Sequence, residues 1–544
     1  MRKLVVVFIV AIWVLGFGMW DVQTRAAQPA APRLIVILVA DQFRSDYLDL
    51  YKRRWRSGFR VLLDQGAVFP RAEYRYLNTA TCAGHATIAT GALPRTHGLI
   101  LNRWWHRGER RAYNCTEDEA SPHVSYGAPA QSGNSAKRMA VPTLADELRA
   151  QRPGARVVAL ALKSRSAVAL AGHGGDIVTW FDDGSRSFVT SRAFATEPVA
   201  AVRAYIDRDP PHADLGKVWV QQDRDDSYVH PDAGVGERPK AGWTALFPHP
   251  LVGANGADAQ FFDRWQKSPF SDAYLGRMAG TLLEDLQLGR RQTTDYLAVS
   301  FSALDLMGHD FGSDSREVED LLAHLDATIG ALLQLLDDRV GRDNYVVALT
   351  SDHGAAPTPD RHDGGHIASE DLQHVAEQAL IARWGPAPAD SPYVAWLSSG
   401  SVYFGNGVFD RLRRDGAALD AVTDALLSVP GVMRVLRADN LSPASRDAFV
   451  RAAAAGYVAG HSGDLFLIPA RHWVFELRVE NEATQHGTFH EYDRFVPVLL
   501  RGYGIRPGRY GGSASPMDVA PTLAHLAGLA LPKADGRVLR EALR

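Results

Sequence analysis

The sequence predicts an α/β fold in which a largely parallel sheet is covered by helices. Several short apolar runs are continuous rather than alternating, which is typical of strands buried on both faces of a sheet. Amphipathic helical patterns lie between these runs. The chain has 544 residues, of which 46% are hydrophobic and 22% are charged. It can therefore hold one large α/β domain with insertions.

Four of the apolar runs end in polar residues that could serve in a functional site. In chain order they are residues 34–41, 156–165, 295–305 and 345–353. Ligands of open parallel sheets bind at the carboxyl ends of the strands. The coincidence of four such ends therefore predicts one shared site at this edge of the sheet.

Three further elements follow from local patterns. Ser315 is expected to cap a helix whose regular apolar face belongs to the core. Residues 515–532 predict a C-terminal helix. Pro497 lies in an apolar run and cannot donate a hydrogen bond to a neighbouring strand. We therefore expect this run to be an edge strand or to contain a bulge.

The N-terminus has the order of a secretory signal. Arg2 and Lys3 precede the apolar run 4–20, and small residues follow it. We assign a signal peptide to residues 1–27, with a retained N-terminal anchor as the alternative. No other stretch is long and apolar enough to span a bilayer. A periplasmic or secreted protein is therefore expected, without stable membrane insertion once the signal is removed.

The rest of the chain, residues 31–544, is expected to form one catalytic domain with two insertions. Residues from about 184 to 270 are rich in Asp, Pro, Gly and Trp and show little periodicity. Residues from about 370 to 480 alternate strand-like and helical segments, so we interpret them as a small α+β cap.

Net charge and cysteine content narrow the classes of partner and metal site. A formal net charge of −3 gives no reason to expect a nucleic-acid partner. The two cysteines, Cys82 and Cys115, lack zinc-finger spacing, so a metal would be held by histidines and carboxylates. In an oxidising compartment they could form one disulfide, and free thiols are the alternative.

Candidate metal ligands gather at the predicted strand ends. Asp305 and His309 are four residues apart, so one helical turn places both on one side. Catalytic zinc usually takes three protein ligands and leaves a position open, so six ligands suit two metals. Each residue alone is better explained as a helix cap or a satisfied polar group. The six candidates are Asp41, Asp305, His309, Asp352, His353 and His486.

Other histidines are expected outside the ligand set. His362 and His366 share the four-residue spacing but do not directly follow an apolar strand, so we place them in a loop. His85 and His97 flank a predicted helix, and we interpret them as structural or supporting residues.

Two cations predict an anion site beside the metals. Lys163 and Arg165 are two apart at a predicted strand end, where extended geometry points both to one face. They suit a phosphate monoester dianion better than a diester, which carries one charge. A solvated strand end is the alternative. Asn102 is a plausible amide donor to another oxygen, or a loop residue.

With these residues in hand, the chain resembles the alkaline phosphatase superfamily. In particular, it is similar to the periplasmic alkaline phosphatases that use a threonine nucleophile and a Lys-x-Arg pair. The motifs, in order, are "VADQF", "TATCAGHATIATG", "LNRWW", "LKSRSAV", "LDLMGHDFG", "TSDHG", "QHGT" and "SPMDVAPTLA". The resemblance implies an α/β/α sandwich around a mixed, mostly parallel sheet.

The resemblance also implies two zinc ions and a role for each site residue. Thr81 would be the nucleophile and form a phospho-threonine intermediate, while Thr79 and Cys82 would be its structural neighbours. Small-molecule phosphate monoesters would be the substrates. One zinc would be held by Asp305, His309 and His486, and the other by Asp41, Thr81, Asp352 and His353. The phosphoryl oxygens would be bound by Asn102, Lys163 and Arg165.

Each alternative function requires a sequence feature that can be compared with this chain. A phosphodiesterase or nucleotide pyrophosphatase of the same superfamily would use the same metals but should lack the Lys-x-Arg pair. A sulfatase would need a C-x-P-x-R motif, whereas Cys82 is followed by Ala83 and Gly84. A catalytically inactive metal-dependent binding protein is disfavoured, because the hydroxyl at Thr81 and all six ligands are retained.

Overall fold

The computed structural model describes residues 31–544 except 241, 389 and 478–481. The predicted signal peptide therefore lies outside the described residues. An eleven-stranded sheet forms among the described residues, in the order β21-β2-β20-β13-β1-β12-β7-β8-β9-β5-β6. Its central strands are β13 (Tyr345–Thr350), β1 (Leu34–Ala40), β12 (Asp295–Phe301), β7 (Val157–Ala161) and β8 (Ile177–Asp182). Its flanking strands are β21 (Gly508–Arg509), β2 (Ala67–Glu73), β20 (Phe495–Gly502), β9 (Ser187–Ser191), β5 (Glu117–Ser125) and β6 (Gly133–Asn134).

The pairing of these strands makes the sheet mixed. The five central strands are parallel to one another. Toward both edges the neighbours β20, β9 and β5 pair antiparallel. The predicted α/β sheet is therefore confirmed, with its parallel pairing concentrated in the centre, where the strands are buried on both faces.

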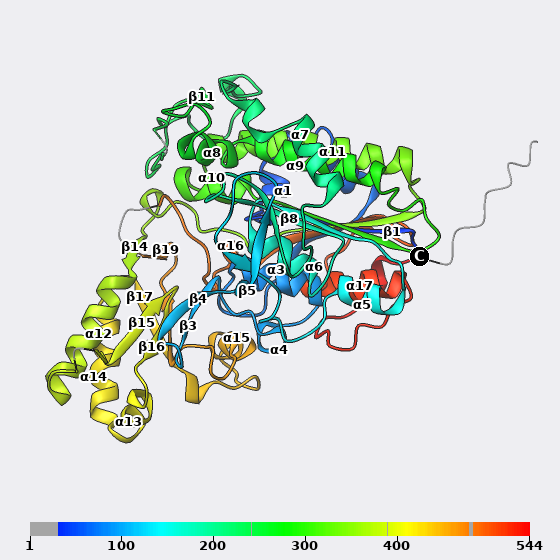
Figure 1. Cartoon of the computed structure of the whole chain (residues 1–544). Coiled ribbons are helices and arrows are strands. Elements are labelled where there is room, and N and C mark those ends of the chain that lie inside the picture. Colours follow the sequence, from blue (N-terminus) through cyan, green and yellow to red (C-terminus); the bar gives the residue numbers. More distant parts are fainter. Residues whose placement is uncertain (1–30, 241, 389, 478–481) are drawn as a thin grey trace, which may run out of the picture.

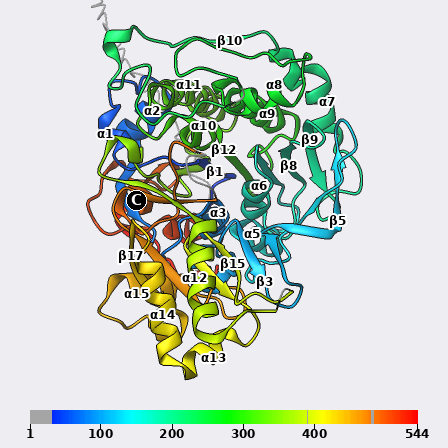
Figure 2. The ribbon, with the colours of Figure 1, turned by 90° about the vertical axis from the view of Figure 1, so that its left-hand side faces the viewer.

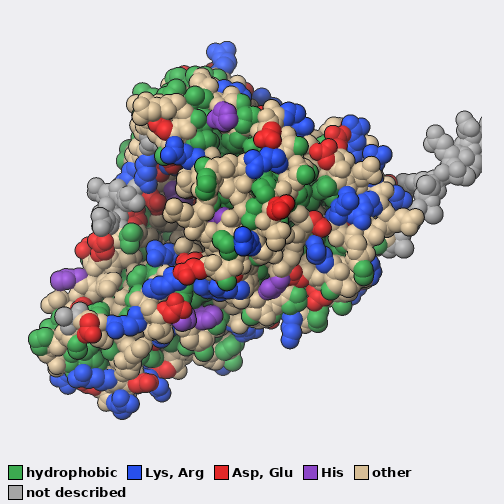
Figure 3. Space-filling model, viewed as in Figure 1, with side chains coloured by type: hydrophobic (Ala, Val, Ile, Leu, Met, Phe, Trp, Pro, Cys, Tyr) green, Lys and Arg blue, Asp and Glu red, His purple; other side chains and the backbone are tan. Residues whose placement is uncertain are grey.

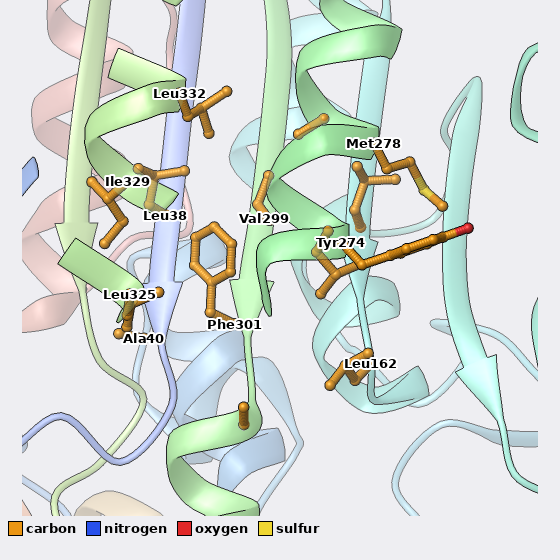
Figure 4. Close-up of a cluster of buried hydrophobic side chains, with 14 of the residues drawn as sticks. Leu38, Ala40, Leu162, Tyr274, Met278, Val299, Phe301, Leu325, Ile329 and Leu332 are labelled. Carbon is orange, nitrogen blue, oxygen red and sulfur yellow. The ribbon is translucent and has the colours of Figure 1, made fainter. Parts of the chain in front are cut away.

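Helices cover both faces of the sheet, which gives three layers (Figure 1). Leu34, Val36 and Leu38 of β1 pack in one hydrophobic cluster with α9 (Pro269–Asp285) and α11 (Arg316–Arg339). Figure 4 shows Ile329 and Leu332 of α11 beside Leu38. The alternate residues of β1 point to the other face, because successive strand side chains point to opposite sides. There the cover is α3 (Thr81–Thr90), α6 (Ser164–Ala171), α5 (Leu144–Gln151) and α17 (Val519–Leu526).

Of the two predicted helices, the one capped by Ser315 is confirmed, and the C-terminal one is shorter than predicted. The Ser315 hydroxyl accepts a hydrogen bond from the Val318 N–H at 3.2 Å and so caps α11, as predicted. The predicted C-terminal helix is shorter than expected. It comprises a 3₁₀ turn, Pro516–Asp518, and α17, which ends at Leu526.

Pro497 does not lie in an edge strand, so that part of the prediction is wrong. Its strand β20 pairs with both β2 and β13 inside the sheet. The alternative, a bulge, is correct, since the register with β2 shifts between Phe69 and Ala72. These residues face Val498 and Val496, which flank Pro497. The missing N–H therefore falls where the ladder is already irregular.

The predicted cap residues form a second, smaller sheet away from the main one (Figures 1 and 2). A separate hydrophobic cluster lies between this sheet and three of its helices, and a second cluster joins the sheet to the fourth helix, residues 448–456. The α+β composition agrees with the prediction, while the division into domains stays a prediction. Its strands, in spatial order, are β15 (Val394–Ser398), β16 (Ser401–Phe404), β18 (Leu465–Pro469) and β17 (Val432–Arg437). Its helices are α12 (Ser369–Trp384), α13 (Val408–Arg414), α14 (Gly416–Leu427) and α15 (Ala448–Gly456).

The other predicted insertion holds short elements around a long irregular stretch. It contains α7 (Ala200–Arg208), β10 (Val218–Trp219), β11 (His249–Pro250) and α8 (Ala259–Gln266). The remaining elements are α1 (Tyr47–Leu50), α2 (Gly58–Gln65), α4 (Pro94–His97), α10 (Ala303–Phe311), α16 (Glu491–Arg494), β3 (Arg103–His106), β4 (Arg111–Asn114), β14 (Gly365–Ala368) and β19 (Trp473–Glu476).

On the face seen in Figure 3, basic and acidic side chains are interspersed, and neither sign of charge dominates. Within the part of the chain that the structure describes, no helix is long and apolar enough to cross a membrane.

Candidate active site

The carboxyl ends of the central strands meet at one pocket, as predicted. Asp41 directly follows β1, Lys163 follows β7 by two residues, and α10 begins two residues after β12. The pocket has a volume of about 830 Å³. Its walls include Thr81, Asn102, Lys163, Arg165, Asp305, His309 and His486. Asp41, Asp352 and His353 lie buried behind these residues.

All three predicted histidine ligands are held in the same way. Nδ1 of His309 donates to the Thr484 carbonyl at 3.1 Å, and Nδ1 of His353 donates to the Gly354 carbonyl at 2.9 Å. Nδ1 of His486 donates to the Thr79 carbonyl at 2.9 Å. When neutral, each ring therefore keeps its lone pair on Nε2, the nitrogen that faces the site. This is the arrangement of metal-binding histidines.

Asp305, His309 and His486 form what we call the outer group. His309 Nε2 lies 3.4 Å from Asp305 Oδ1, and His486 Nε2 lies 3.8 Å from the same oxygen. Asp305 and His309 are one turn apart on α10, as their spacing predicts. Burial alone would raise the pKa of Asp305, but Lys163 and His309 outweigh it and hold that pKa well below its usual range.

Asp41, Asp352 and His353 form the inner group, and Thr81 lies against it. His353 Nε2 is 3.1 Å from Asp352 Oδ2 and 3.3 Å from Thr81 Oγ1. Asp41 accepts hydrogen bonds from the hydroxyls of Ser300 and Ser302, both at 2.9 Å. Asp352 Oδ2 has no hydrogen-bond partner among the described residues. A buried carboxylate oxygen in this state fits a metal ligand.

Within the inner group, His353 is the residue that also contacts the outer group. Its ligand atom and those of Asp305 and His486 lie within 4.8 Å of one another. Its ring also stacks on that of His486, with 3.5 Å between centroids. The structure thus brings together all six predicted ligands. The assignment of His353 to the metal of Asp41 and Asp352 stays a prediction.

His85 also lies within this distance of Asp41 and Asp352, but its hydrogen bonds exclude it as a ligand. Its Nδ1 donates to the Thr81 carbonyl at 2.9 Å. Its Nε2 lies 2.8 Å from the Ser300 hydroxyl, whose hydrogen goes to Asp41, so Nε2 must donate too. Although burial opposes it, Asp352 and Asp41 raise the pKa of His85 to about 9. His85 is therefore a supporting cation, in line with the sequence interpretation.

Gln42 is a site residue that the sequence reasoning missed. Its backbone N–H donates to Asp352 Oδ1 at 3.2 Å, and its side-chain amide donates to Asp305 Oδ1 at 2.9 Å. It thereby links the inner group to the outer group. The backbone at Gln42 has a φ of 65°, which is unusual for a residue with a side chain and is common at functional sites. Its place directly after Asp41 was the available signal.

Lys163 connects the two groups electrostatically. Its Nζ donates to Asp41 Oδ2 at 2.7 Å and to Asp305 Oδ2. The expectation that Lys163 and Arg165 share one extended strand is wrong. The strand ends at Ala161, Lys163 occupies the N-cap of α6, and Arg165 lies in its first turn. Both still line the pocket, because the helix begins at the strand end. Arg165 Nε is buried without a hydrogen-bond partner among the described residues.

Thr81 is the first residue of α3, and Asn102 lies beside it. The Asn102 Oδ1 accepts a hydrogen bond from the Cys82 N–H at 2.9 Å. Cys82 and Cys115 form the disulfide that the sequence allows. The hydroxyl of Thr79 donates to the Thr488 carbonyl at 3.2 Å, away from the ligands. The ring of His362 lies against that of His472 in a tilted arrangement, and His366 contacts Glu476. Neither histidine is among the residues that line the pocket.

Comparison with known proteins identifies the family to which the chain belongs. Residues 35–493 match the family described as type I phosphodiesterase / nucleotide pyrophosphatase. The chain belongs to this family. The chain is 28% identical to alkaline phosphatase PafA of Elizabethkingia meningoseptica over 98% of both chains. It is 30% identical to alkaline phosphatase PhoK of Sphingomonas sp, covering 95% of this chain and 92% of that one.

Solved structures show the same fold. The crystal structure of PafA superposes with a TM-score of 0.85 at 27% identity, covering 94% of this chain and 99% of PafA. Murine ectonucleotide pyrophosphatase / phosphodiesterase 5 shares the fold, with a TM-score of 0.54 at 13% identity, and covers 94% of this chain and 99% of that one. The predicted alkaline phosphatase superfamily and α/β/α fold are thereby confirmed, and the protein is a phosphoester hydrolase.

Proposed function

We propose that the protein is an alkaline phosphatase that hydrolyses small-molecule phosphate monoesters with two zinc ions. The observation that carries the proposal is the pair Lys163 and Arg165 on the wall of a pocket lined by metal-ligand side chains. Two cations suit the doubly charged phosphoryl group of a monoester. The alkaline phosphatase names of the relatives PafA and PhoK support the same substrate class.

A solved variant of PafA supports the individual roles. That variant carries substitutions at one threonine, one asparagine, one lysine and one arginine. The threonine and asparagine are separated by as many positions as Thr81 and Asn102. The lysine and arginine are separated by as many as Lys163 and Arg165. We therefore assign Thr81 as the nucleophile and the other three residues as ligands of the phosphoryl oxygens.

The donor set fits two zinc ions. It consists of three carboxylates and three imidazoles with Nε2 turned inward, and Asp352 Oδ2 awaits a partner. Bound zinc would supply charge stabilisation for the attacking and leaving oxygens. One ion would be held by Asp305, His309 and His486, and the other by Asp41, Thr81, Asp352 and His353.

The chain's own groups then perform two displacements at phosphorus. In the first, the Thr81 hydroxyl releases its proton to solvent and a bond forms between Thr81 Oγ1 and phosphorus as the bond to the leaving oxygen breaks. The leaving oxygen takes up a proton from solvent. In the second, water cleaves the phospho-threonine, releasing inorganic phosphate and restoring the hydroxyl. Asn102, Lys163 and Arg165 would donate to the equatorial oxygens throughout, together with the N-terminus of α3.

The runner-up is a phosphodiesterase or nucleotide pyrophosphatase, which the family description itself favours. Steady-state kinetics of the zinc-loaded enzyme with an aryl phosphate monoester and the matching methyl diester separate the two. We expect kcat/KM for the monoester to exceed that for the diester. Arg165→Ala should lower the monoester value by roughly 10²-fold and the diester value much less, since the lost cation faces the extra charge. Faster diester cleavage by the unaltered enzyme would overturn the proposal.

We also place the protein in the periplasm or outside the cell. The predicted signal peptide supports export, and so does the disulfide, because disulfides persist in oxidising compartments. Intact-mass measurement of the exported protein should show that residues 1–27 are missing. A cytoplasmic enzyme of full mass would contradict this assignment.

A further inference from the structure

The disulfide between Cys82 and Cys115 holds Asn102 from both sides. Cys82 is the second residue of α3, directly after Thr81, and Cys115 directly follows β4. The Cys82 N–H donates to the side-chain oxygen of Asn102 at 2.9 Å, and the Cys115 N–H donates to its backbone carbonyl at 2.9 Å. The backbone N–H groups of both cysteines therefore bind the same asparagine. Cys82 binds the side chain of Asn102, and Cys115 binds its backbone carbonyl.

The side-chain bond sets the direction of the Asn102 amide. The N-cap of α3 is Ala80, which offers no side-chain acceptor, so Asn102 Oδ1 caps the helix from 20 residues along the chain. Because Oδ1 accepts this bond, the amide nitrogen Nδ2 is the end left to donate elsewhere. Asn102 lines the pocket beside Thr81. A phosphoryl oxygen bound at Thr81 would find this donor already oriented.

The disulfide is well placed to maintain that orientation. Both sulfur-bearing residues are buried, with exposed fractions of 0% and 2%. The bond joins residues 33 positions apart, and the loop that it closes contains Asn102 and the β3–β4 hairpin. A cross-link of this kind restricts the relative movement of the two segments it joins. Here those segments carry the proposed nucleophile and the proposed amide donor.

We propose that the Cys82–Cys115 disulfide is a positioning element for phosphoryl binding, which acts by holding the Asn102 amide against the first turn of α3. The proposal rests on the proposed function, in which Asn102 binds a phosphoryl oxygen. It assigns the cysteines no contact with substrate.

A double-mutant cycle on the zinc-loaded enzyme tests the proposal. The variants are Cys82→Ala/Cys115→Ala, Asn102→Ala and the combination of all three substitutions, assayed with an aryl phosphate monoester at 25 °C. We expect the cysteine pair to lower kcat/KM about tenfold and to weaken inhibition by inorganic phosphate, since small misplacements of binding groups reduce rates strongly. Asn102→Ala should cost at least as much. The triple variant should be no worse than Asn102→Ala, because the disulfide then has nothing to position.

A matched control separates positioning from stability. Leu426→Ala removes a buried side chain of helix α14, which packs on the second, smaller sheet. It should lower Tm without changing kcat/KM. If the cysteine variant behaves like this control, or if its loss adds to that of Asn102→Ala, the positioning role is refuted and the proposed function stands. If Asn102→Ala itself is fully active, the phosphate assignment of Asn102 fails, and the positioning role fails with it.

A second measurement covers a cysteine variant that does not fold. The unaltered zinc enzyme is titrated with a phosphine reductant, and free thiols are counted by mass spectrometry beside kcat/KM. Activity that falls in step with the thiols, and that does not fall further in Asn102→Ala, supports the proposal. Full activity of the reduced enzyme refutes it.

Discussion

The inner and outer ligand groups use the same residue types but differ in their access to solvent. The side chains of Asp41, Asp352 and His353 have exposed fractions of 0%. In the outer group, His309 is 17% exposed and His486 is 8% exposed. The same pocket therefore has one side built into the core and one side open to its entrance.

The packing around each group explains the difference. The inner group is enclosed by the start of α3, where a Cβ at Gly84 would collide with the carbonyl oxygen of Asp352. The cation His85 lies between its two carboxylates. The outer group depends instead on α10 and on the loop that carries His486. We infer that the buried side suits a fixed nucleophile, while the open side suits a leaving group that must depart.

The sharpest test of this comparison is the nucleophile beside the inner group. Thr81→Ala removes the hydroxyl next to His353, so kcat/KM for a monoester should fall by more than about 10³-fold while the zinc content stays the same. Steady-state kinetics with metal analysis measure both. Thr79→Ala is the matched control, since that hydroxyl donates to the Thr488 carbonyl rather than to a ligand side chain, and it should retain activity within a few-fold. Equal losses in the two variants would contradict the assignment.

Metal release should show the difference in access directly. A strong chromophoric chelator is expected to remove two zinc ions per chain in two phases, about tenfold or more apart in rate. The faster phase belongs to the outer group, because His309 and His486 can reach solvent during ligand exchange. His309→Ala should abolish the fast phase and leave the slow one. A single phase for two ions would show that the groups are equally accessible.

The smallest expected effect is on thermal stability and concerns Asp272, which binds the start of the helix that carries Asp305 and His309. Its carboxylate accepts hydrogen bonds from the N–H groups of Ser302 and Ala303, at the start of α10. Burial, the largest cause, raises the pKa of Asp272 from 3.8 to about 7. Since this folded pKa is raised, the stability that Asp272 contributes is fully present below about pH 4. It is lost as the pH rises through about 7.

Asp272→Asn keeps the acceptor oxygen but cannot ionise. Its Tm relative to the unaltered holoenzyme should therefore rise between pH 5 and pH 8, by about 2 °C. Thermal unfolding across this range measures the change. Asp64→Asn, at an exposed carboxylate paired with Arg60, is the control and should show no such rise. A difference in Tm that is independent of pH would mean that Asp272 is ionised throughout.

Local patterns predicted much of the fold and the chemistry of the site. Strands β1, β12 and β13 were recognisable because continuous apolar runs report burial on both faces. The positions of Asp305 and His309 on one helical face followed from their spacing. Ligand type limited the metal chemistry, and the order of the motifs pointed to the superfamily. All of these signals are contained in short stretches of chain.

The failures concern residues whose surroundings come from distant segments. Nothing near Pro497 says that β2 will pair on its other side, or that the register there will shift. The sequence predicts an extended strand end at Arg165, because it does not show that α6 begins directly behind Lys163. Gln42 was overlooked, since its link between Asp352 and Asp305 exists only once β1, β13 and α10 are side by side.

The sequence by itself determined which side chains could bind metal and phosphate, and at which strand ends they would lie. Only the tertiary structure decided how those side chains are held. The Thr79 carbonyl fixes His486 from 407 residues away, and Lys163 joins two carboxylates that belong to different strand ends. Periodicity and spacing describe the near neighbours of a residue, whereas hydrogen bonds across a sheet depend on strand order, which no single segment encodes.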